Sequence, residues 1–280
     1  MANITTTTAA NFIPEIWSDG VKNYLERKLV FEQLVDSSYS ELVKGRGDTF
    51  HIPKLSESSD AAKSAGSAVS FSADTHGESQ LTVDQHRYVA KLIEDIAAVQ
   101  ANPGLLEKEV STMGYALAKT MDAFIESKIE AASTNGAQLA GDNVITAAEL
   151  REGMKILMEN DVPTEECNLV VSPALYTALL GIDDFVDASK YGDGAPAATG
   201  NIGRLYGMPV FTSTVMGASG TTNTEVGYIV HPSAVNFARQ LEPRVQSDYS
   251  VEDLGTKVVS DVLYGAVTTF EGRIYEFRNP

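Results

Sequence analysis

The chain has 280 residues, 43% of them hydrophobic, and its 38 acidic and 21 basic side chains give a formal net charge of −17 at pH 7. This composition can build a hydrophobic core, which excludes a wholly disordered chain. The acidic excess disfavours a protein that grips nucleic acid, because such binding depends on Lys and Arg at phosphates. No apolar run reaches the roughly 20 residues that span a bilayer, and residues 1–11 do not resemble a secretory signal. We therefore expect a soluble protein made in the cytoplasm.

The first predicted element is an amphipathic helix over residues 11–36. Pro14 suits its first turn, and an apolar stripe at three- and four-residue spacing is formed by Trp17, Val21, Tyr24, Leu25 and Leu29. A helix so near the start of the chain must lay this stripe on its own domain or, as an arm, on a neighbouring subunit.

A long hairpin follows. Residues 44–48 predict a turn, residues 49–53 a short strand, and Leu81 and Val83 begin an alternating run that reads as the returning strand. Between them, residues 56–79 are mostly Ser, Ala, Gly and Asp, with few apolar anchors. Two strands that bracket such a tract predict an extended hairpin that projects from the body of the protein.

The strongest helix signal starts at Asn102, a good N-cap, and Pro103, which suits the first helical position. Asn135 and Gly136 are expected to end the helix. One apolar seam runs along it through Leu106, Val110, Met113, Leu117, Met121 and Phe124. About 30 residues correspond to roughly 45 Å of helix, a length that suits a spine rather than a small globule.

The rest of the chain alternates helices with strands. Thr146 and Glu149 form a capping-box pattern at the start of a helix, and a buried strand is expected at residues 168–172. Ser172 and Pro173 should cap a further short helix. Strands are then expected at residues 208–212, 227–231, 245–251, 256–270 and 273–277. The β-α alternation predicts a compact α/β part followed by a β tail.

Motifs that carry chemistry are weak in this sequence. The four histidines, His51, His76, His86 and His231, lie far apart without metal-ligand spacing. The glycine-rich run at residues 200–207 fits neither nucleotide-binding pattern and is interpreted as a turn into a strand. We predict no catalytic, cofactor-binding or metal-binding residues, and the chain does not read as an enzyme.

Two single features have alternative readings. Arg46-Gly47-Asp48 spells a cell-adhesion tripeptide, but two glycines and solvated charges favour a hairpin turn. Cys167 follows Glu165 and Glu166, whose charges disfavour a reactive thiolate. A structural thiol is therefore favoured over a redox or nucleophilic role.

The order of these parts resembles the major capsid protein family of tailed bacteriophages, with its Hong Kong 97-like fold. The resemblance covers nearly the whole chain. Local stretches that look like this family run from Phe12 to Trp17, Gly47 to Pro53, Leu169 to Tyr176, Gly203 to Val210, His231 to Ala234 and Asp261 to Ala266. Each stretch is weakly specific alone, and their shared order is more specific.

The resemblance implies an α+β fold with four parts. These are an N-terminal arm (1–45), an E-loop hairpin (46–90), a P-domain with the spine helix and a β-sheet (91–140 and 241–258), and an α/β A-domain (141–240 and 259–280). It also implies a structural subunit that self-assembles into hexamers and pentamers of an icosahedral head enclosing packaged double-stranded DNA.

The same resemblance implies partners and contacts. The expected partners are other copies of the chain, a portal protein, and a scaffolding or decoration protein. The expected locations are the virion and, during assembly, the host cytoplasm, with no membrane and no cofactor. Some relatives crosslink through a hairpin lysine. The candidate assembly contacts are Trp17, Arg46, Asp48, Lys54 and Lys63.

Three other classes remain open from the sequence. An encapsulin-like nanocompartment shell shares the fold. A tail or decoration protein of the same virus is a second alternative, and an enzyme with a mobile lid is a third.

Overall fold

A computed structural model describes residues 30–44, 49–56, 58, 60–69, 71, 76–94, 105–139, 141, 144–182, 203–216 and 225–280. The elements in chain order are η2 (Phe31–Leu34), α1 (Ser40–Val43), β1 (Thr49–Lys54), β2 (Gly77–Thr82), β3 (Gln85–Glu94), α3 (Leu105–Ala132), β4 (Asn135–Gln138), α4 (Ala147–Glu159), η3 (Thr164–Glu166), β5 (Asn168–Val171), α5 (Pro173–Leu179), β6 (Arg204–Leu205), β7 (Met208–Thr212), β8 (Glu225–Val230), η5 (Pro232–Ala234), β9 (Val235–Ser250), β10 (Gly255–Thr268), η6 (Glu271–Arg273) and β11 (Ile274–Arg278). The fold is α+β, as the sequence predicts.

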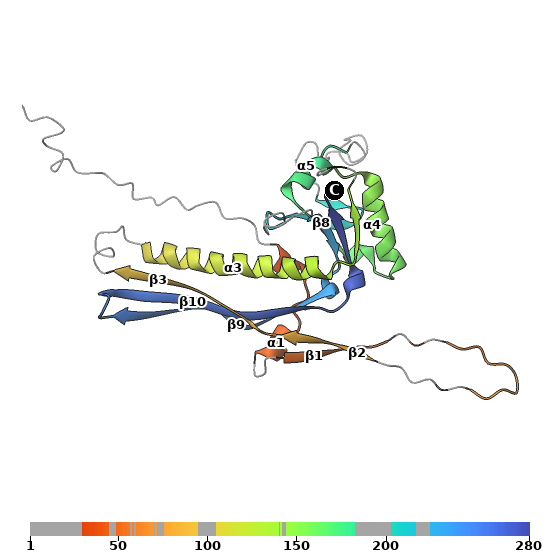
Figure 1. Ribbon diagram of the computed structural model, residues 1–280, viewed down its shortest axis with the longest axis horizontal. Helices are drawn as coiled ribbons and strands as arrows, with labels where there is room; N and C mark the ends of the chain where they lie inside the picture. The colour runs from red at the N-terminus through yellow and green to blue at the C-terminus, as the bar shows by residue number, and fades with distance from the viewer. Residues whose placement is uncertain are drawn as a thin grey trace, which may run out of the picture.

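The spine helix α3 lies along a long three-stranded sheet in the order β3-β10-β9 (Figure 1). Met113, Leu117 and Met121 are buried, as predicted, and the seam continues through Ile125 and Ile129. The sequence predicts Phe124 as the next residue of the seam. In the structure Ile125 takes that place, and Phe124 is only partly buried at the edge of the core. The side chains of residues 106 and 110 lie outside the described part.

Helix α3 also binds the segment at the start of the described chain, residues 30–34. Asp122 is almost fully buried, and its Oδ1 accepts hydrogen bonds from the backbone N–H groups of Val30 (3.1 Å) and Phe31 (2.8 Å). Phe31 and Leu34 join the same core. The predicted helix over residues 11–36 falls mostly outside the described residues. Its described end is a single 3₁₀ turn followed by a bridge between Asp36 and Asn236, so the helix does not continue to residue 36.

A mixed six-stranded sheet in the order β4-β11-β8-β5-β7-β6 forms the second body. Alternation along β5 explains how this sheet is covered: Leu169 and Val171 face α4 and α5, whereas Val170 faces the core shared with α3. The predicted caps are confirmed. Thr146 and Glu149 form the capping box of α4, and Ser172 Oγ accepts from the N–H of Leu175 at the start of α5.

Strands β1 and β2 form the predicted hairpin, in a two-stranded sheet of their own. Strand β3, which the sequence places on the same returning run, instead pairs with β10. The expected boundaries at 90/91 and 258/259 therefore fall inside the continuous strands β3 and β10. Figure 1 shows the hairpin loop and the β9–β10 arm extending in opposite directions from the body.

Strand β9 is an edge strand and is irregular near its middle. Its pairing with β10 passes from Arg244↔Asp261 to Leu241↔Leu263 and then to Arg239↔Tyr264, so two bulges fall within residues 239–244. Pro243, which has no N–H to donate, lies inside this bulged segment. None of the described helices is both long and apolar enough to cross a membrane.

Candidate assembly surface

The hairpin is rooted on the long sheet. Its pairing runs from Thr49↔Thr82 to Lys54↔Gly77. The root is fixed by a small buried cluster of Val43, Ile52, Leu81, Val83 and Ala238. The same packing includes Leu263 and Val267 of β10, so the hairpin has a defined base on the face of the sheet opposite to α3.

Beyond its root, the hairpin exposes apolar side chains. Leu55 is 81% exposed and Phe71 is 95% exposed, and Val69 is also exposed. No regular secondary structure is found in the described residues between β1 and β2. Exposed apolar groups on a projecting segment are typical of a surface that another molecule covers.

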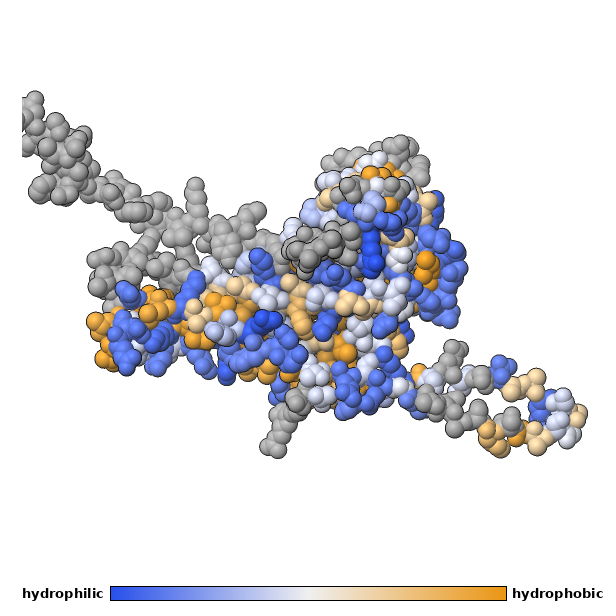
Figure 2. All heavy atoms as spheres, viewed as in Figure 1, coloured by the Kyte–Doolittle hydropathy of each residue, from blue (hydrophilic) through white to orange (hydrophobic). Residues whose placement is uncertain are grey.

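The far part of the three-stranded sheet has an uncovered face. Lys91 Nζ donates to Thr112 Oγ1 of α3, and Val89 packs against the core below α3, so these two residues face the helix. Tyr88 and Leu92 therefore point to the opposite face, and they are 69% and 44% exposed. Apolar residues also gather at the end of the β9–β10 arm, visible at the left in Figure 2.

A charged clamp joins the three strands on this open face. Arg244 of β9 donates from Nε (2.8 Å) and Nη2 (3.0 Å) to the carboxylate of Asp261 on β10, and His86 of β3 lies 3.1 Å from Asp261 Oδ2. The hydrogen bond from Arg244 is the largest cause that lowers the pKa of Asp261. The clamp lies next to the bulges and stabilises the sheet where its register changes.

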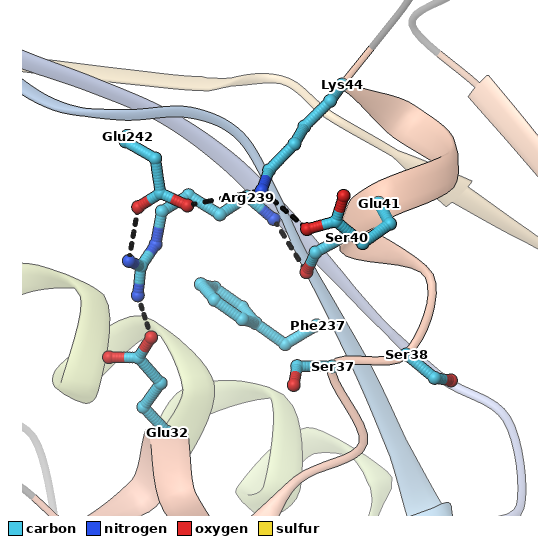
Figure 3. Close-up of a pocket in the computed structure, with 9 residues that line it drawn as sticks. All are labelled: Glu32, Ser37, Ser38, Ser40, Glu41, Lys44, Phe237, Arg239 and Glu242. Carbon is cyan, nitrogen blue, oxygen red and sulfur yellow. Dashed lines mark hydrogen bonds and ion pairs between the residues drawn. The ribbon is translucent and has the colours of Figure 1, made fainter.

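A second charged group lies where η2, α1 and β9 meet (Figure 3). Arg239 pairs with Glu32 and with Glu242, to which Nη1 donates at 2.7 Å. Lys44 pairs with Glu41 at 2.7 Å and lies 3.8 Å from Glu242. The hydrogen bond and charge of Glu41, with a smaller contribution from Glu242, raise the pKa of Lys44. These residues line a cavity of about 350 Å³.

Two of the five predicted contact residues, Lys54 and Lys63, lie in the described part of the chain. Lys54 ends β1, and its Nζ lies 5.5 Å from the centre of the Phe270 ring; both residues line an open groove of about 690 Å³. Lys63 is exposed in the hairpin tract. Trp17, Arg46 and Asp48 lie outside the described residues. Sequence reasoning missed Arg239 and Arg244, because no local motif marks their partners.

Possible reactive groups have ordinary structural surroundings. Cys167 is fully buried, and burial, with a smaller effect from Glu166, raises the pKa of its thiol to about 11. This favours the predicted structural thiol, with burial as the main cause. Within the described ranges, no three His, Cys, Asp or Glu side chains are arranged to hold a metal ion.

Solved capsid structures share this fold. A chain of Mycobacterium phage Che8 superposes with a TM-score of 0.82 at 23% identity, covering 95% of this chain and 97% of that one. The capsid of cyanophage P-SCSP1u gives 0.81 at 16% identity, covering 100% and 97%. The mature capsid of bacteriophage PhiM1 gives 0.78 at 15% identity, covering 95% and 92%. These likenesses define a protein with the Hong Kong 97-like capsid fold, as the sequence predicts.

A comparison of the sequence with protein-family models identifies the family of the chain. The model of the phage capsid protein family matches residues 90–274, well over half of the chain, and the chain belongs to this family. No curated protein matches the sequence. The family match favours a structural subunit of a phage head over the encapsulin-like alternative.

Proposed function

We propose that this chain is the major shell subunit of a phage head, and that its copies form hexamers and pentamers of an icosahedral shell around packaged double-stranded DNA. The family match supports the structural role. One observation supports the assembly mode: apolar side chains are uncovered on two surfaces at opposite ends of the molecule, the hairpin tract and the open face of the long sheet.

Two different surfaces that cover each other produce a head-to-tail contact. In the proposed contact, the hairpin of one subunit lies over the long sheet of the next. Phe71 and Leu55 would then be buried against side chains such as Tyr88 and Leu92. Burial of one large apolar side chain contributes about 1.5–3 kcal/mol to binding. Several such side chains together offset part of the free-energy cost of association.

The four predicted parts keep their roles in this proposal. Residues 1–45 would be the arm, 46–90 the E-loop hairpin, 91–140 and 241–258 the P-domain, and 141–240 and 259–280 the A-domain. Two of these bounds would change, because β3 and β10 are continuous members of one sheet: residues 85–90 and 259–268 would then belong to the P-domain with the rest of these strands. Trp17, Arg46, Asp48, Lys54 and Lys63 remain proposed contacts between subunits.

The remaining partners are also proposals. The shell would incorporate a portal protein and would use scaffolding or decoration proteins where the virus encodes them. Assembly would take place in the host cytoplasm. The formal charge of −17 supports a lining that encloses DNA without binding it tightly.

Electron microscopy of assembled wild-type and variant protein tests the proposal. Phe71→Ser removes an apolar side chain of the hairpin that is 95% exposed, and it should reduce shell formation at a given protein concentration. Met158→Ser is the matched control, because Met158 is also exposed (54%) but lies on α4, away from both surfaces. Closed shells formed equally well by Phe71→Ser and wild type would contradict the hairpin contact, and wild-type protein that never forms shells or capsomers would contradict the function.

A further inference from the structure

The one-turn helix α1 lies at the start of the hairpin, joined to β1 by residues 45–48. Its polar contacts with the body go to one short segment of β9. The backbone N–H of Arg239 donates to Ser40 Oγ at 3.4 Å, and Gln240 Nε2 donates to the carbonyl oxygen of Val43 at 3.1 Å. These β9 residues lie in the bulged part of the strand, where the register with β10 shifts twice.

Five charged residues connect the same elements in alternating order. They run from η2 through the bulge of β9 to α1: Glu32, Arg239, Glu242, Lys44 and Glu41. Glu242 is the residue of this row that contacts both cations. Removing its charge would divide the row into two separate pairs, Glu32 with Arg239 and Lys44 with Glu41. Figure 3 shows these side chains around Phe237, at the edge of the cavity.

The row is open to solvent. Arg239 is 19% exposed, but Lys44 is 39% and Glu242 is 57% exposed. Ions in solution therefore screen these pairs, because the Debye length falls from about 30 Å at 0.01 M salt to about 3 Å at 1 M. The cavity of about 350 Å³ lies between α1 and β9, so α1 has space to shift once the row no longer holds it.

We propose that Glu32, Arg239, Glu242, Lys44 and Glu41 form a salt-sensitive latch that fixes the angle of the hairpin in the free subunit. At low ionic strength the latch holds α1 on the bulge of β9, and the hairpin takes one orientation relative to α3. At high ionic strength α1 moves and takes Val43 out of the apolar root, so the hairpin, still held there by Ile52, Leu81 and Val83, samples several orientations. This inference concerns the isolated subunit and does not depend on shell formation.

Pulsed electron paramagnetic resonance on unassembled subunits measures this angle. Spin labels are placed on Gln80→Cys in β2 and Thr120→Cys in α3, two exposed positions, in a Cys167→Ala background. We expect a narrow distance distribution at 0.01 M salt and one about twofold broader at 1 M, because the row is screened. A distribution of the same width at both salt concentrations overturns the proposal.

Two variants locate the effect. Glu242→Gln should give the broad distribution even at 0.01 M salt. Glu152→Gln is the matched control, because Glu152 is also half exposed (52%) and pairs with a lysine, Lys155 at 3.1 Å, but lies on α4. It should behave as wild type. A narrow distribution for Glu242→Gln, or equal broadening by both variants, overturns the latch. If Glu242→Gln does not fold, Lys44→Gln replaces it in the experiment. This variant removes the pairs of Lys44 with Glu41 and Glu242 and should give the same broad distribution.

Discussion

Gly265 on β10 lies directly against the backbone of Thr82 on β2: a Cβ atom on Gly265 would lie 2.1 Å from the carbonyl oxygen of Thr82. The hairpin therefore crosses the long sheet in backbone-to-backbone contact. Only a residue without a side chain permits this approach.

Gly265→Ala should destabilise the protein by about 1–3 kcal/mol, because a methyl group must push β2 away from β10. Gly114→Ala on α3 is the control, because its added Cβ would meet nothing within 4 Å. It should stabilise α3 by about 0.5–1 kcal/mol through helix propensity. Urea unfolding of both variants checks the opposite signs. A neutral Gly265→Ala would mean that the hairpin is not docked at this crossing.

Leu117→Asp should prevent stable folding. Leu117 is 2% exposed in the core between α3 and the sheets, and an unpaired carboxylate there costs about 4 kcal/mol or more. Thr120→Asp, one turn away on the exposed side of the same helix, should remain soluble and folded. Soluble expression and circular dichroism distinguish the two. Normal folding of Leu117→Asp would show that the seam is not a core face.

Stability should fall in acid partly through Asp261. Its pKa is lowered in the folded protein, chiefly by Arg244, from an ordinary value of 3.8. A lowered pKa contributes stability that is present above the ordinary value and is lost as the pH falls through the folded value. Asp261→Asn and Arg244→Met should both flatten the decline of the urea midpoint below about pH 4. Unchanged slopes in both variants would exclude the clamp as a source of acid sensitivity.

Protease should cut the hairpin tract between β1 and β2 faster in free subunits than in assembled shells. The described residues of this tract are largely exposed and have few contacts within the chain, so protection must come from a neighbour. Mass spectrometry of timed digests identifies the cut sites. Equal cleavage rates in both states would argue against a hairpin that is covered on assembly.

Local signals in the sequence predicted much of the fold. The capping box of Thr146 and Glu149, the cap at Ser172 and the seam through Leu117 depend on neighbours within a few residues, and the structure confirms all three. The partner of β3 was not predictable in this way, because pairing with β10 joins residues more than 160 positions apart, such as Glu94 and Gly255.

The candidate surface was harder to predict than the fold. The pairs that define it, Arg239 with Glu32 and His86 with Asp261, are made across the tertiary structure, and charged residues at such spacings carry no local pattern. Lys54 was predicted as a contact because of its place in the hairpin. Its neighbour Phe270 was not predicted, since the corner between β10 and η6 has no sequence signal that points to β1.

Pro243 has a consequence for the behaviour of concentrated subunits. An edge strand offers backbone donors and acceptors to any other strand, and long flat edges promote aggregation. On β9 a proline and two bulges interrupt this row of backbone donors and acceptors near the middle of the strand. A second β9 cannot pair along the whole length of this edge, so continuous edge-to-edge pairing through β9 is interrupted while side-chain contacts between subunits stay available. Association through the β9 edge is therefore expected to rely on side-chain contacts near residues 239–244, which disfavours fibril-like pairing along this strand.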